Sequence, residues 1–176
     1  MKIALFGNVY QEHKPEAIGG FIEIVKKQGA ELAIHKPFHD FITGDLNLEI
    51  IPEEIIQDDD FTADIAVCMG GDGTFLNVAQ IVDHKQIPIL GINTGRLGFL
   101  ASFSPEDMDK AIIDICNGRY GIEERGLLHI SCDELDIEDY PFALNEIAIL
   151  KHDIASMISI HTSINGEYLT TYQADG

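Results

Sequence analysis

The stretch that most constrains the fold of this chain runs from Asp64 to Leu76. Its first half, residues 65–69, is a short apolar run with β-branched members, which is typical of a buried strand in a parallel sheet. The run ends at a group of glycines. Apolar residues then recur at the spacing of a helix, at Phe75, Leu76, Val78, Ala79 and Val82. We therefore expect the glycines to lie at the carboxyl end of a strand, where open α/β sheets bind ligands.

The glycine-rich turn reads Gly70-Gly71-Asp72-Gly73-Thr74. Glycines at this density permit a sharp turn or a close approach of the backbone to a ligand. Backbone N–H groups near a helix start attract phosphate, but the turn has neither the lysine of a Walker A loop nor the spacing of the dinucleotide fingerprint. The Asp72 carboxylate suits a general base for an attacking hydroxyl, or an anchor for a hydroxyl or a magnesium ion. The structural alternative is a tight turn in which Asp72 caps the helix.

A second glycine-bearing loop follows the next predicted strand. The strand covers residues 87–92 and the loop covers residues 93–100. The two loops should lie at the same edge of the sheet, because parallel strands end at one edge. Arg96 in this loop suits a contact with a phosphate, and its alternative role is a surface ion pair.

The rest of the first 120 residues alternates between strand and helix patterns. A strand over residues 2–6, a helix from Pro15 to the stop at Gly29, and a strand over residues 31–35 predict a β-α-β unit with a right-handed crossover. Residues 36–61 are predicted as a surface connection with one or two short helical pieces. Ser104 and Pro105 predict a further helix start, and Gly118 its end. The buried face of this helix is expected at Met108, Ala111, Ile112 and Ile115.

The pattern changes near Tyr120 and becomes all-β. Strands are expected over residues 127–131, 142–150 and 157–164. Asn165-Gly166 then predicts a hairpin turn with a return strand over residues 167–172. We therefore expect an α/β N-terminal domain with a parallel Rossmann-like sheet over residues 1–120. The start of an all-β domain follows over residues 121–176, where about 55 residues are marginal for a separate core.

Charge and composition exclude several function classes. The chain has 176 residues and a formal charge of −19, from 11 basic and 30 acidic residues. This balance argues against a nucleic-acid partner, and an anionic substrate would need local cations or a metal ion. No stretch is long enough to span a membrane, and no signal peptide is recognisable. The odd, widely spaced Cys68, Cys116 and Cys132 favour reduced thiols and a cytoplasmic protein. The histidines have no zinc spacing, so no metal site is predicted within the protein itself.

Four motifs in order resemble those of the bacterial NAD kinase family. They are Gly70–Thr74, the loop from Gly91 to Leu100, Leu144-Asn145-Glu146, and Asn165-Gly166-Glu167 followed by residues 172–176. Diacylglycerol and sphingosine kinases carry the first motif too, and phosphofructokinases carry a close variant. The four motifs together cover nearly the whole chain, which makes the resemblance specific.

The resemblance implies a transfer of the terminal phosphate of ATP to the 2′-hydroxyl of the adenosine ribose of NAD. It implies that Asp72 is the catalytic base, and that Asp72 and Gly73 lie against the substrate. Asn145 and Glu146 would hold NAD through hydrogen bonds to its hydroxyls and adenine. Asp175 would reach a substrate bound by the neighbouring subunit, which implies a homo-oligomer, a dimer or tetramer.

The resemblance further implies that Gly70, Gly71 and Thr74 form a phosphate loop. Magnesium, or another divalent cation, would arrive with ATP, and polyphosphate is a donor for some family members. Two features depart from the family: Gln173 stands where an arginine is usual, and the chain stops at Gly176. The second departure favours a C-terminally truncated chain with little or no activity by itself.

Two other functions stay open on the residues alone. The first is a lipid kinase that shares the first motif, although the Asn145-Glu146 pair suits a hydroxyl-rich ligand better than a lipid. The second is a non-catalytic nucleotide-binding fragment. Replacement of Asp72 by Asn separates a catalytic from a structural role, because a base is needed for turnover more than for binding.

Overall fold

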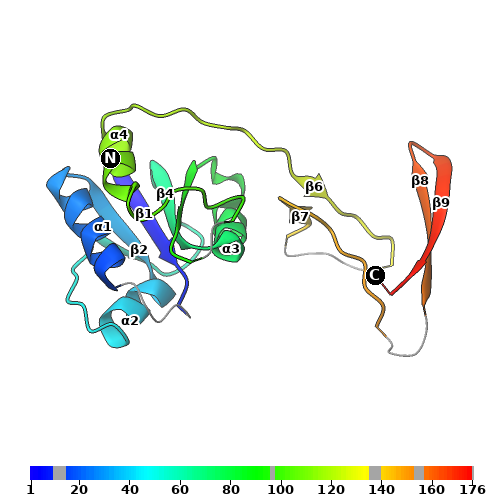
Figure 1. Cartoon of the computed structure of the whole chain (residues 1–176), viewed down its shortest axis with the longest axis horizontal. Helices are drawn as coiled ribbons and strands as arrows, with labels where there is room; N and C mark the ends of the chain where they lie inside the picture. The colour runs from blue at the N-terminus through cyan, green and yellow to red at the C-terminus, as the bar shows by residue number, and fades with distance from the viewer. Residues whose placement is uncertain (10–14, 96–97, 135–139, 153–156, 176) are drawn as a thin grey trace. The chain divides into compact units, whose positions relative to one another are not determined.

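The structure is a computed structural model that describes residues 1–9, 15–95, 98–134, 140–152 and 157–175. The chain folds as two compact units, Met1–Glu124 and Arg125–Gly176. Figure 1 shows helices packed around a sheet in the first unit and strands in the second. Each unit is described by itself.

The first unit is built on a sheet of five parallel strands. The strands are β1 (Lys2–Gly7), β2 (Glu31–His35), β3 (Glu54–Ile56), β4 (Ile65–Gly70) and β5 (Ile89–Asn93). Their spatial order is β3-β2-β1-β4-β5, so the winding of the chain reverses between β1 and β4. Ligands bind at such a reversal in open α/β sheets. The predicted parallel Rossmann-like sheet is confirmed, and its reversal lies beside the strand that ends in the glycine-rich turn.

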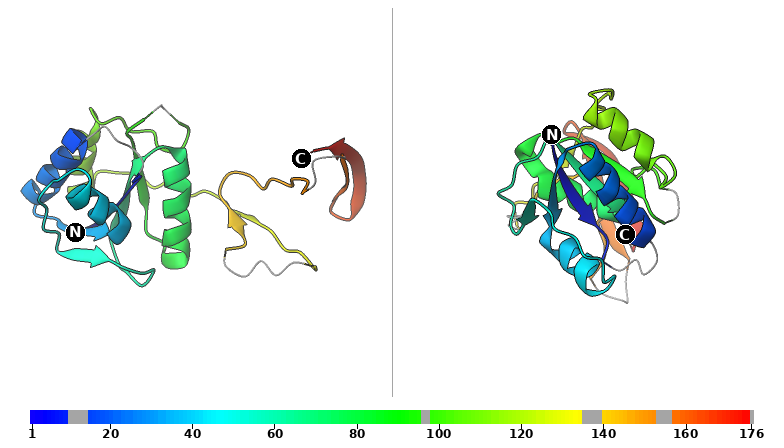
Figure 2. Two further views of the ribbon diagram at one scale, coloured as in Figure 1. Left: turned by 90° about the horizontal axis from the view of Figure 1, so that it is seen from below. Right: turned by 90° about the vertical axis from the view of Figure 1, so that its left-hand side faces the viewer.

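Helices cover both faces of this sheet. They are α1 (Pro15–Lys27), α2 (Lys36–Gly44), α3 (Asp72–Val82) and α4 (Met108–Cys116), and α3 is followed by the 3-10 turn η1 (Asp83–Lys85). The left view in Figure 2 places α3, in green, on the face opposite α1, in blue, and the two buried clusters agree. One joins α1, α2 and α4 to the sheet, and the other joins α3 to it.

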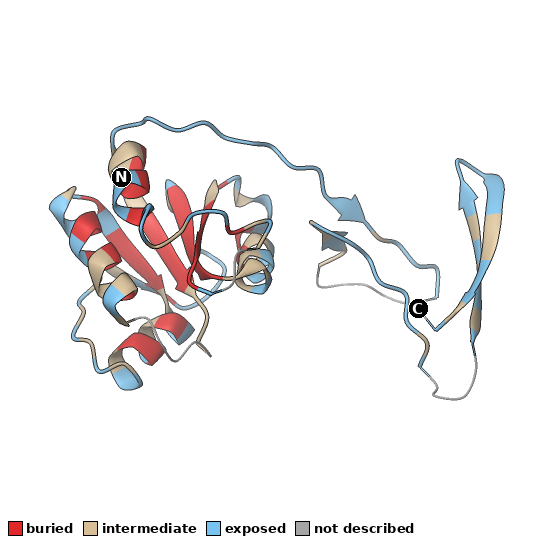
Figure 3. Ribbon diagram, viewed as in Figure 1, coloured by how far each residue is buried: buried red, intermediate tan, exposed pale blue. Residues whose placement is uncertain are grey.

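The strand β4 shows why the sheet is covered on both sides. All six of its residues are buried. Because successive side chains of a strand point to opposite faces, Val67 and Met69 join the cluster under α1 and α4, whereas Ala66 and Cys68 join the cluster under α3. Figure 3 shows this buried interior in red. The apolar run at 65–69 therefore folds as predicted.

Residues 36–61 contain one of the predicted short helical pieces, but this helix is buried against the sheet and the segment adds a strand, which a surface connection does not do. The helix α2 follows β2 at once and buries Phe38, Phe41 and Ile42, and β3 pairs with β2 in parallel. Pro37 occupies the first turn of α2, where the missing N–H costs nothing. The strand β3 has three residues, which is too short to show an alternating pattern.

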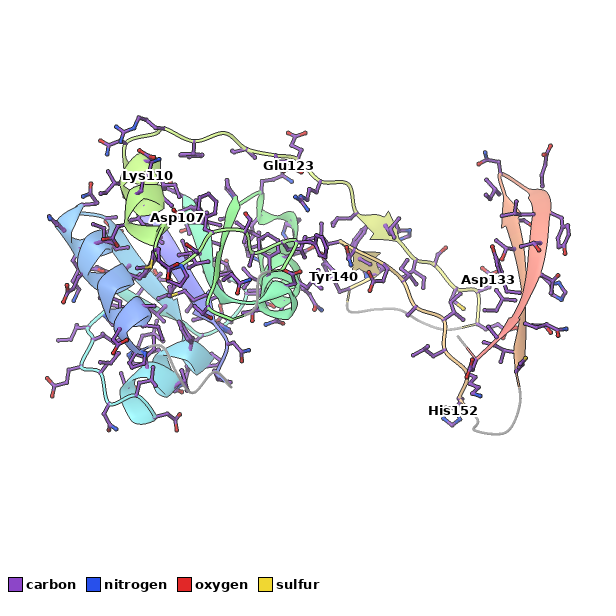
Figure 4. All side chains as sticks on the ribbon, in the orientation of Figure 1. Asp107, Lys110, Glu123, Asp133, Tyr140 and His152 are labelled. Atoms are coloured by element: carbon purple, nitrogen blue, oxygen red, sulfur yellow. The ribbon has the colours of Figure 1, made fainter. Side chains whose placement is uncertain are left out.

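The helix predicted to start at Ser104 begins later, at Met108. Ser104 Oγ donates a hydrogen bond of 2.9 Å to Asp107 Oδ2, and residues 105–107 form a turn before α4. Asp107, labelled in Figure 4, is therefore the residue that flanks the helix start. The buried face of α4 is as predicted. Gly118 follows the helix end with a φ of 68°, which is the left-handed conformation that favours glycine.

The described part of the second unit contains short antiparallel pairs. They are β6 (Leu128–His129) with β7 (Phe142–Ala143), and β8 (Ile158–Ile164) with β9 (Glu167–Ala174). The predicted Asn165-Gly166 turn is confirmed, with φ values of 53° and 84° that suit a two-residue hairpin. The predicted strands over 127–131 and 142–150 are too long, because each pairs over two residues.

None of the residues described in this second unit is buried, as the pale colours of Figure 3 show. Large apolar side chains such as Leu150, Met157 and Tyr168 are exposed. Apolar surface of this kind is typical of a face that packs against something else. Within the described residues of both units, no helix has the length and apolar character needed to cross a membrane.

Candidate active site

The glycine-rich turn is tighter than its sequence predicts. The strand β4 ends at Gly70 and α3 begins at Asp72, so Gly71 alone separates strand from helix. Gly73 and Thr74 belong to the first turn of α3. A Cβ atom on Gly70 would collide with the Thr74 side chain, whose own Cβ would lie 2.6 Å away. Glycine at position 70 therefore allows Thr74 to pack against the strand end.

Asp72 does not cap α3. The residue that flanks the helix start is Gly71, and its lack of a side chain leaves no side-chain cap there. Asp72 is the first helical residue, where its negative charge suits the positive end of the helix dipole. The capping alternative is wrong in this structure, because the Asp72 carboxylate makes its hydrogen bonds elsewhere.

The carboxylate of Asp72 instead accepts three backbone N–H groups from the second glycine-bearing loop. Oδ2 accepts the N–H of Phe99 at 2.8 Å, and Oδ1 accepts those of Leu100 at 2.9 Å and Ala101 at 3.1 Å. The donors lie 27 to 29 residues further along the chain. The expectation that the two loops meet at one edge of the sheet is thereby confirmed.

These hydrogen bonds favour the ionised form of Asp72. The N–H groups of Phe99, Leu100 and Ala101, in that order of effect, hold the pKa of the Asp72 carboxyl below its usual value. A carboxylate has about four lone-pair positions, so the three bonds leave room for one more donor. In this conformation Asp72 is a fixed, ionised acceptor and a weak base.

The buried side chain of Asn93 shapes the loop that supplies these donors. Asn93 Oδ1 accepts the N–H of Gly95 at 2.8 Å, and Asn93 Nδ2 donates to the carbonyl of Ala101 at 3.4 Å. The N–H of Thr94 donates to the carbonyl of Gly70 at 3.3 Å, which ties the loop to the end of β4. The Asn93 side chain thus forms hydrogen bonds with a residue near the start of the loop and with a residue just after its end.

The returning segment of the loop runs directly against β5. The N–H of Asn93 donates to the carbonyl of Phe103 at 2.7 Å, and the N–H of Phe103 donates to the carbonyl of Gly91 at 3.2 Å. A Cβ on Gly91 would lie 2.7 Å from the Cα of Ala101. The main chain at 99–101 is therefore held in place beside Asp72.

The loop also carries Phe99, whose side chain is 95% exposed and whose N–H group donates to Asp72 Oδ2. Arg96, which the sequence associates with a phosphate, lies outside the described residues. The N–H donors at 99–101 were not predicted from the sequence. The available signal was the adjacent Gly98, where a Cβ atom would collide with the Asp72 carboxylate.

The other predicted site residues belong to the second unit. The side-chain amide of Asn145 donates to the carboxylate of Glu146, and both groups are exposed. The carbonyl of Asp175 accepts the N–H of Lys151 at 3.3 Å, and its carboxylate lies 3.8 Å from Lys151 Nζ. Gln173 pairs with Ser159 across the hairpin. The structure thus brings Asn145 and Glu146 together, and Asp72 with the 99–101 segment.

Titratable side chains do not gather into a metal site in the part of the chain that the structure describes. No group of three or more His, Cys, Asp or Glu residues there could hold a metal ion. Cys68, Cys116 and Cys132 are all free thiols.

Comparison with known proteins identifies the family. The family model of the ATP-NAD kinase N-terminal domain matches residues 17–120. An NAD kinase of Bacteroides fragilis is 49% identical over 176 residues, which are 100% of this chain and 61% of that protein. An NAD kinase of Porphyromonas gingivalis is 37% identical over 99% of this chain and 60% of its own length. The chain thus spans about three fifths of the curated relatives that it matches.

Solved structures share the fold. Yeast NADH kinase complexed with NADH superposes with a TM-score of 0.76 at 20% identity, over 99% of this chain and 55% of that one. An NAD kinase from Archaeoglobus fulgidus in complex with ATP superposes with a TM-score of 0.67 at 26% identity, over 99% of this chain and 58% of that one. The domain match over more than half of the sequence, together with these relatives, shows that the chain belongs to the ATP-NAD kinase family.

Proposed function

We propose that the protein is an NAD kinase, which transfers the terminal phosphate of ATP to the 2′-hydroxyl of the adenosine ribose of NAD. Membership of the family supports this reaction, as do the relatives named as NAD kinases. The single observation that carries the proposal is the Asp72 carboxylate. It is fixed by three N–H groups at the winding reversal of the sheet, and one acceptor position remains open.

Asp72 is proposed to receive the hydroxyl proton. The hydroxyl oxygen forms a bond to the terminal phosphorus, the bond from that phosphorus to the leaving ADP oxygen breaks, and the proton passes to the carboxylate. The N–H groups that lower the pKa of Asp72 make it a weak base. A weak base suffices when the transition state is loose, because the hydroxyl then loses its proton late.

The start of α3 is proposed as the phosphate-binding part. A Cβ on Gly71 or Gly73 would meet no atom within 4 Å, so the backbone there is open to a ligand. The N–H groups of a helix start attract phosphate, and Gly70 and Thr74 keep the turn compact. The exposed ring of Phe99 would offer an apolar surface to the nucleoside.

The second unit is proposed to hold NAD. Asn145 and Glu146 present an amide and a carboxylate side by side, which suits the hydroxyls and ring nitrogens of a nucleoside. Asp175, with its exposed side chain, is proposed to reach a substrate in a neighbouring subunit of a dimer or tetramer. Magnesium would enter with ATP, and the protein would act in the cytoplasm.

The test is NADP formation from NAD, ATP and magnesium by the complete product of the gene. Asp72→Asn should lower kcat by about 10²–10⁴ while NAD binding persists. Asp109→Asn is the matched control, because Asp109 is an exposed aspartate at the start of another helix, and it should retain wild-type turnover.

Two results would contradict the proposed NAD kinase activity and support a different function. A folded protein that makes no NADP but phosphorylates diacylglycerol or sphingosine would be a lipid kinase. A folded protein that binds ATP or NAD and transfers phosphate to neither acceptor would be a nucleotide-binding module. The 176-residue chain assayed alone, beside the complete gene product, measures how much of the activity it carries.

A further inference from the structure

We propose that Gly98 is a positioning residue for Asp72, because the absence of a side chain at position 98 creates the space that the Asp72 carboxylate occupies. The catalytic consequence rests on the proposed kinase function. The placement itself is a property of the folded chain and can be tested without any assay of activity.

The space around Gly98 supports this role directly. The three nearest atoms to a Cβ built on Gly98 are Oδ1, Cγ and Oδ2 of Asp72, and all three would collide with it. A side chain at position 98 would therefore need the volume that the Asp72 carboxylate fills.

The three N–H bonds explain why the carboxylate lies in that space. They come from consecutive main-chain groups at residues 99, 100 and 101, which begin immediately after Gly98. A chain that turns its N–H groups towards one anion brings the preceding Cα close to the same anion. A side chain at position 98 and the carboxylate of Asp72 thus compete for one volume.

Whether the loop or the Asp72 side chain gives way depends on which of the two can move. Ala101 is fully buried and its Cα lies against Gly91, and Asn93 ties the loop at both ends. The Asp72 side chain is partly exposed and can rotate about its two χ angles. Because the loop is held and the carboxylate can turn towards solvent, Gly98→Ala should displace Asp72 and leave the fold intact.

The first experiment measures amide hydrogen exchange at residues 99–101 by NMR. In the wild-type chain these N–H groups are bonded to Asp72 and should exchange slowly. In Gly98→Ala and in Asp72→Ala the exchange of all three should accelerate by about tenfold or more, because the acceptor is gone. Gly19→Ala is the matched control, since a Cβ there meets no atom within 4 Å, and should leave these rates unchanged.

The second experiment measures NADP formation by the complete gene product. Gly98→Ala should lower kcat by about a hundredfold through misplacement of Asp72, with KM for ATP and NAD within about twofold because the other contacts persist. A loss confined to kcat is the result that a general loss of structure would not give.

The outcomes distinguish the placement of Asp72 from its catalytic consequence. Unchanged exchange at 99–101 in both Gly98→Ala and Asp72→Ala would overturn the placement. Accelerated exchange with an unchanged kcat would overturn the positioning role. If exchange accelerates in both variants but the wild-type protein makes no NADP, the placement of Asp72 is supported and the proposed kinase function is contradicted.

Discussion

The carboxylate of Asp72, in the first turn of α3, accepts the backbone N–H of Phe99 at 2.8 Å across 27 residues of sequence. This bond joins the two glycine-bearing loops of the sheet edge into one structure. An anion accepts from a main-chain donor more strongly than a neutral group does. The relationship therefore links the ionisation of one side chain to the conformation of the neighbouring loop.

The first prediction concerns the pH dependence of stability. The pKa of Asp72 is lower in the folded chain than in the unfolded chain, where an aspartate has a pKa of about 3.9. Its contribution to stability is therefore complete above about pH 5, and it is lost as the pH falls through the folded pKa. Wild type should be more stable than Asp72→Asn at neutral pH, and the difference should shrink towards low pH.

Urea unfolding of the two proteins, at intervals of about one pH unit between about pH 7 and about pH 3, measures this convergence. Asp109→Asn removes a surface aspartate for which no such N–H donors are present among the described residues, and it supplies the comparison. A gap between wild type and Asp72→Asn that stays constant down to the lowest pH would contradict the assigned hydrogen bonds.

The second prediction concerns the close approach of backbone at Gly91. A Cβ at this position would lie 2.7 Å from the Cα of Ala101 and 2.9 Å from the ring of Phe75. The main chain at Ala101 can shift less easily than the end of a flexible side chain. Gly91→Ala should therefore destabilise the first unit by about 1–3 kcal/mol. Thermal or urea unfolding measures the change. Gly19→Ala, with open space around its Cβ, should keep wild-type stability or exceed it, and equal stability of the two variants would refute the tight contact.

The third prediction concerns the reactivity of the cysteines. Burial raises the pKa of the Cys68 thiol to about 12, so it carries almost no reactive thiolate at neutral pH. Cys132 is exposed and Cys116 is half-buried. Iodoacetamide at about pH 8, near the pKa of a free thiol, should label Cys132 first, and Cys68 should react only after unfolding in urea.

Peptide mass spectrometry at successive times identifies the labelled positions. Cys132→Ser removes the site that is expected to react fastest and controls for the assignment. Rapid labelling of Cys68 in the folded chain would show that the strand β4 is not buried as described.

Local patterns in the sequence were sufficient to predict most strands and helices of the first unit. The apolar run at 65–69, the helical recurrence after it and, in the second unit, the Asn165-Gly166 turn each express a rule that acts over a few residues. The four motifs at Gly70–Thr74, residues 91–100, residues 144–146 and residues 165–167 with 172–176 were together sufficient to suggest the family. None of these required knowledge of which distant residues touch.

Other features of the fold could not be predicted from local sequence patterns and are set by tertiary contacts. The strand β3 consists of three residues and exists because β2 offers it an unpaired edge, so it has no periodic pattern of its own. The helix α2 buries Phe38, Phe41 and Ile42, and only the tertiary structure shows that this face packs in the core. The predicted short helical piece is confirmed by α2. The prediction of a surface connection missed β3 and the burial of α2, because pairing and burial are non-local and outweigh propensity in such short segments.

The sequence by itself determined that a carboxylate stands among glycines at the end of a buried strand, since residue identity and period are local properties. Tertiary structure alone decided where that carboxylate makes its hydrogen bonds. Asp72 turns away from the cap of its own helix and towards three N–H groups beyond Gly98. The physical reason is that a hydrogen bond depends on distance and direction between atoms, and these are set only when β4 and β5 lie side by side.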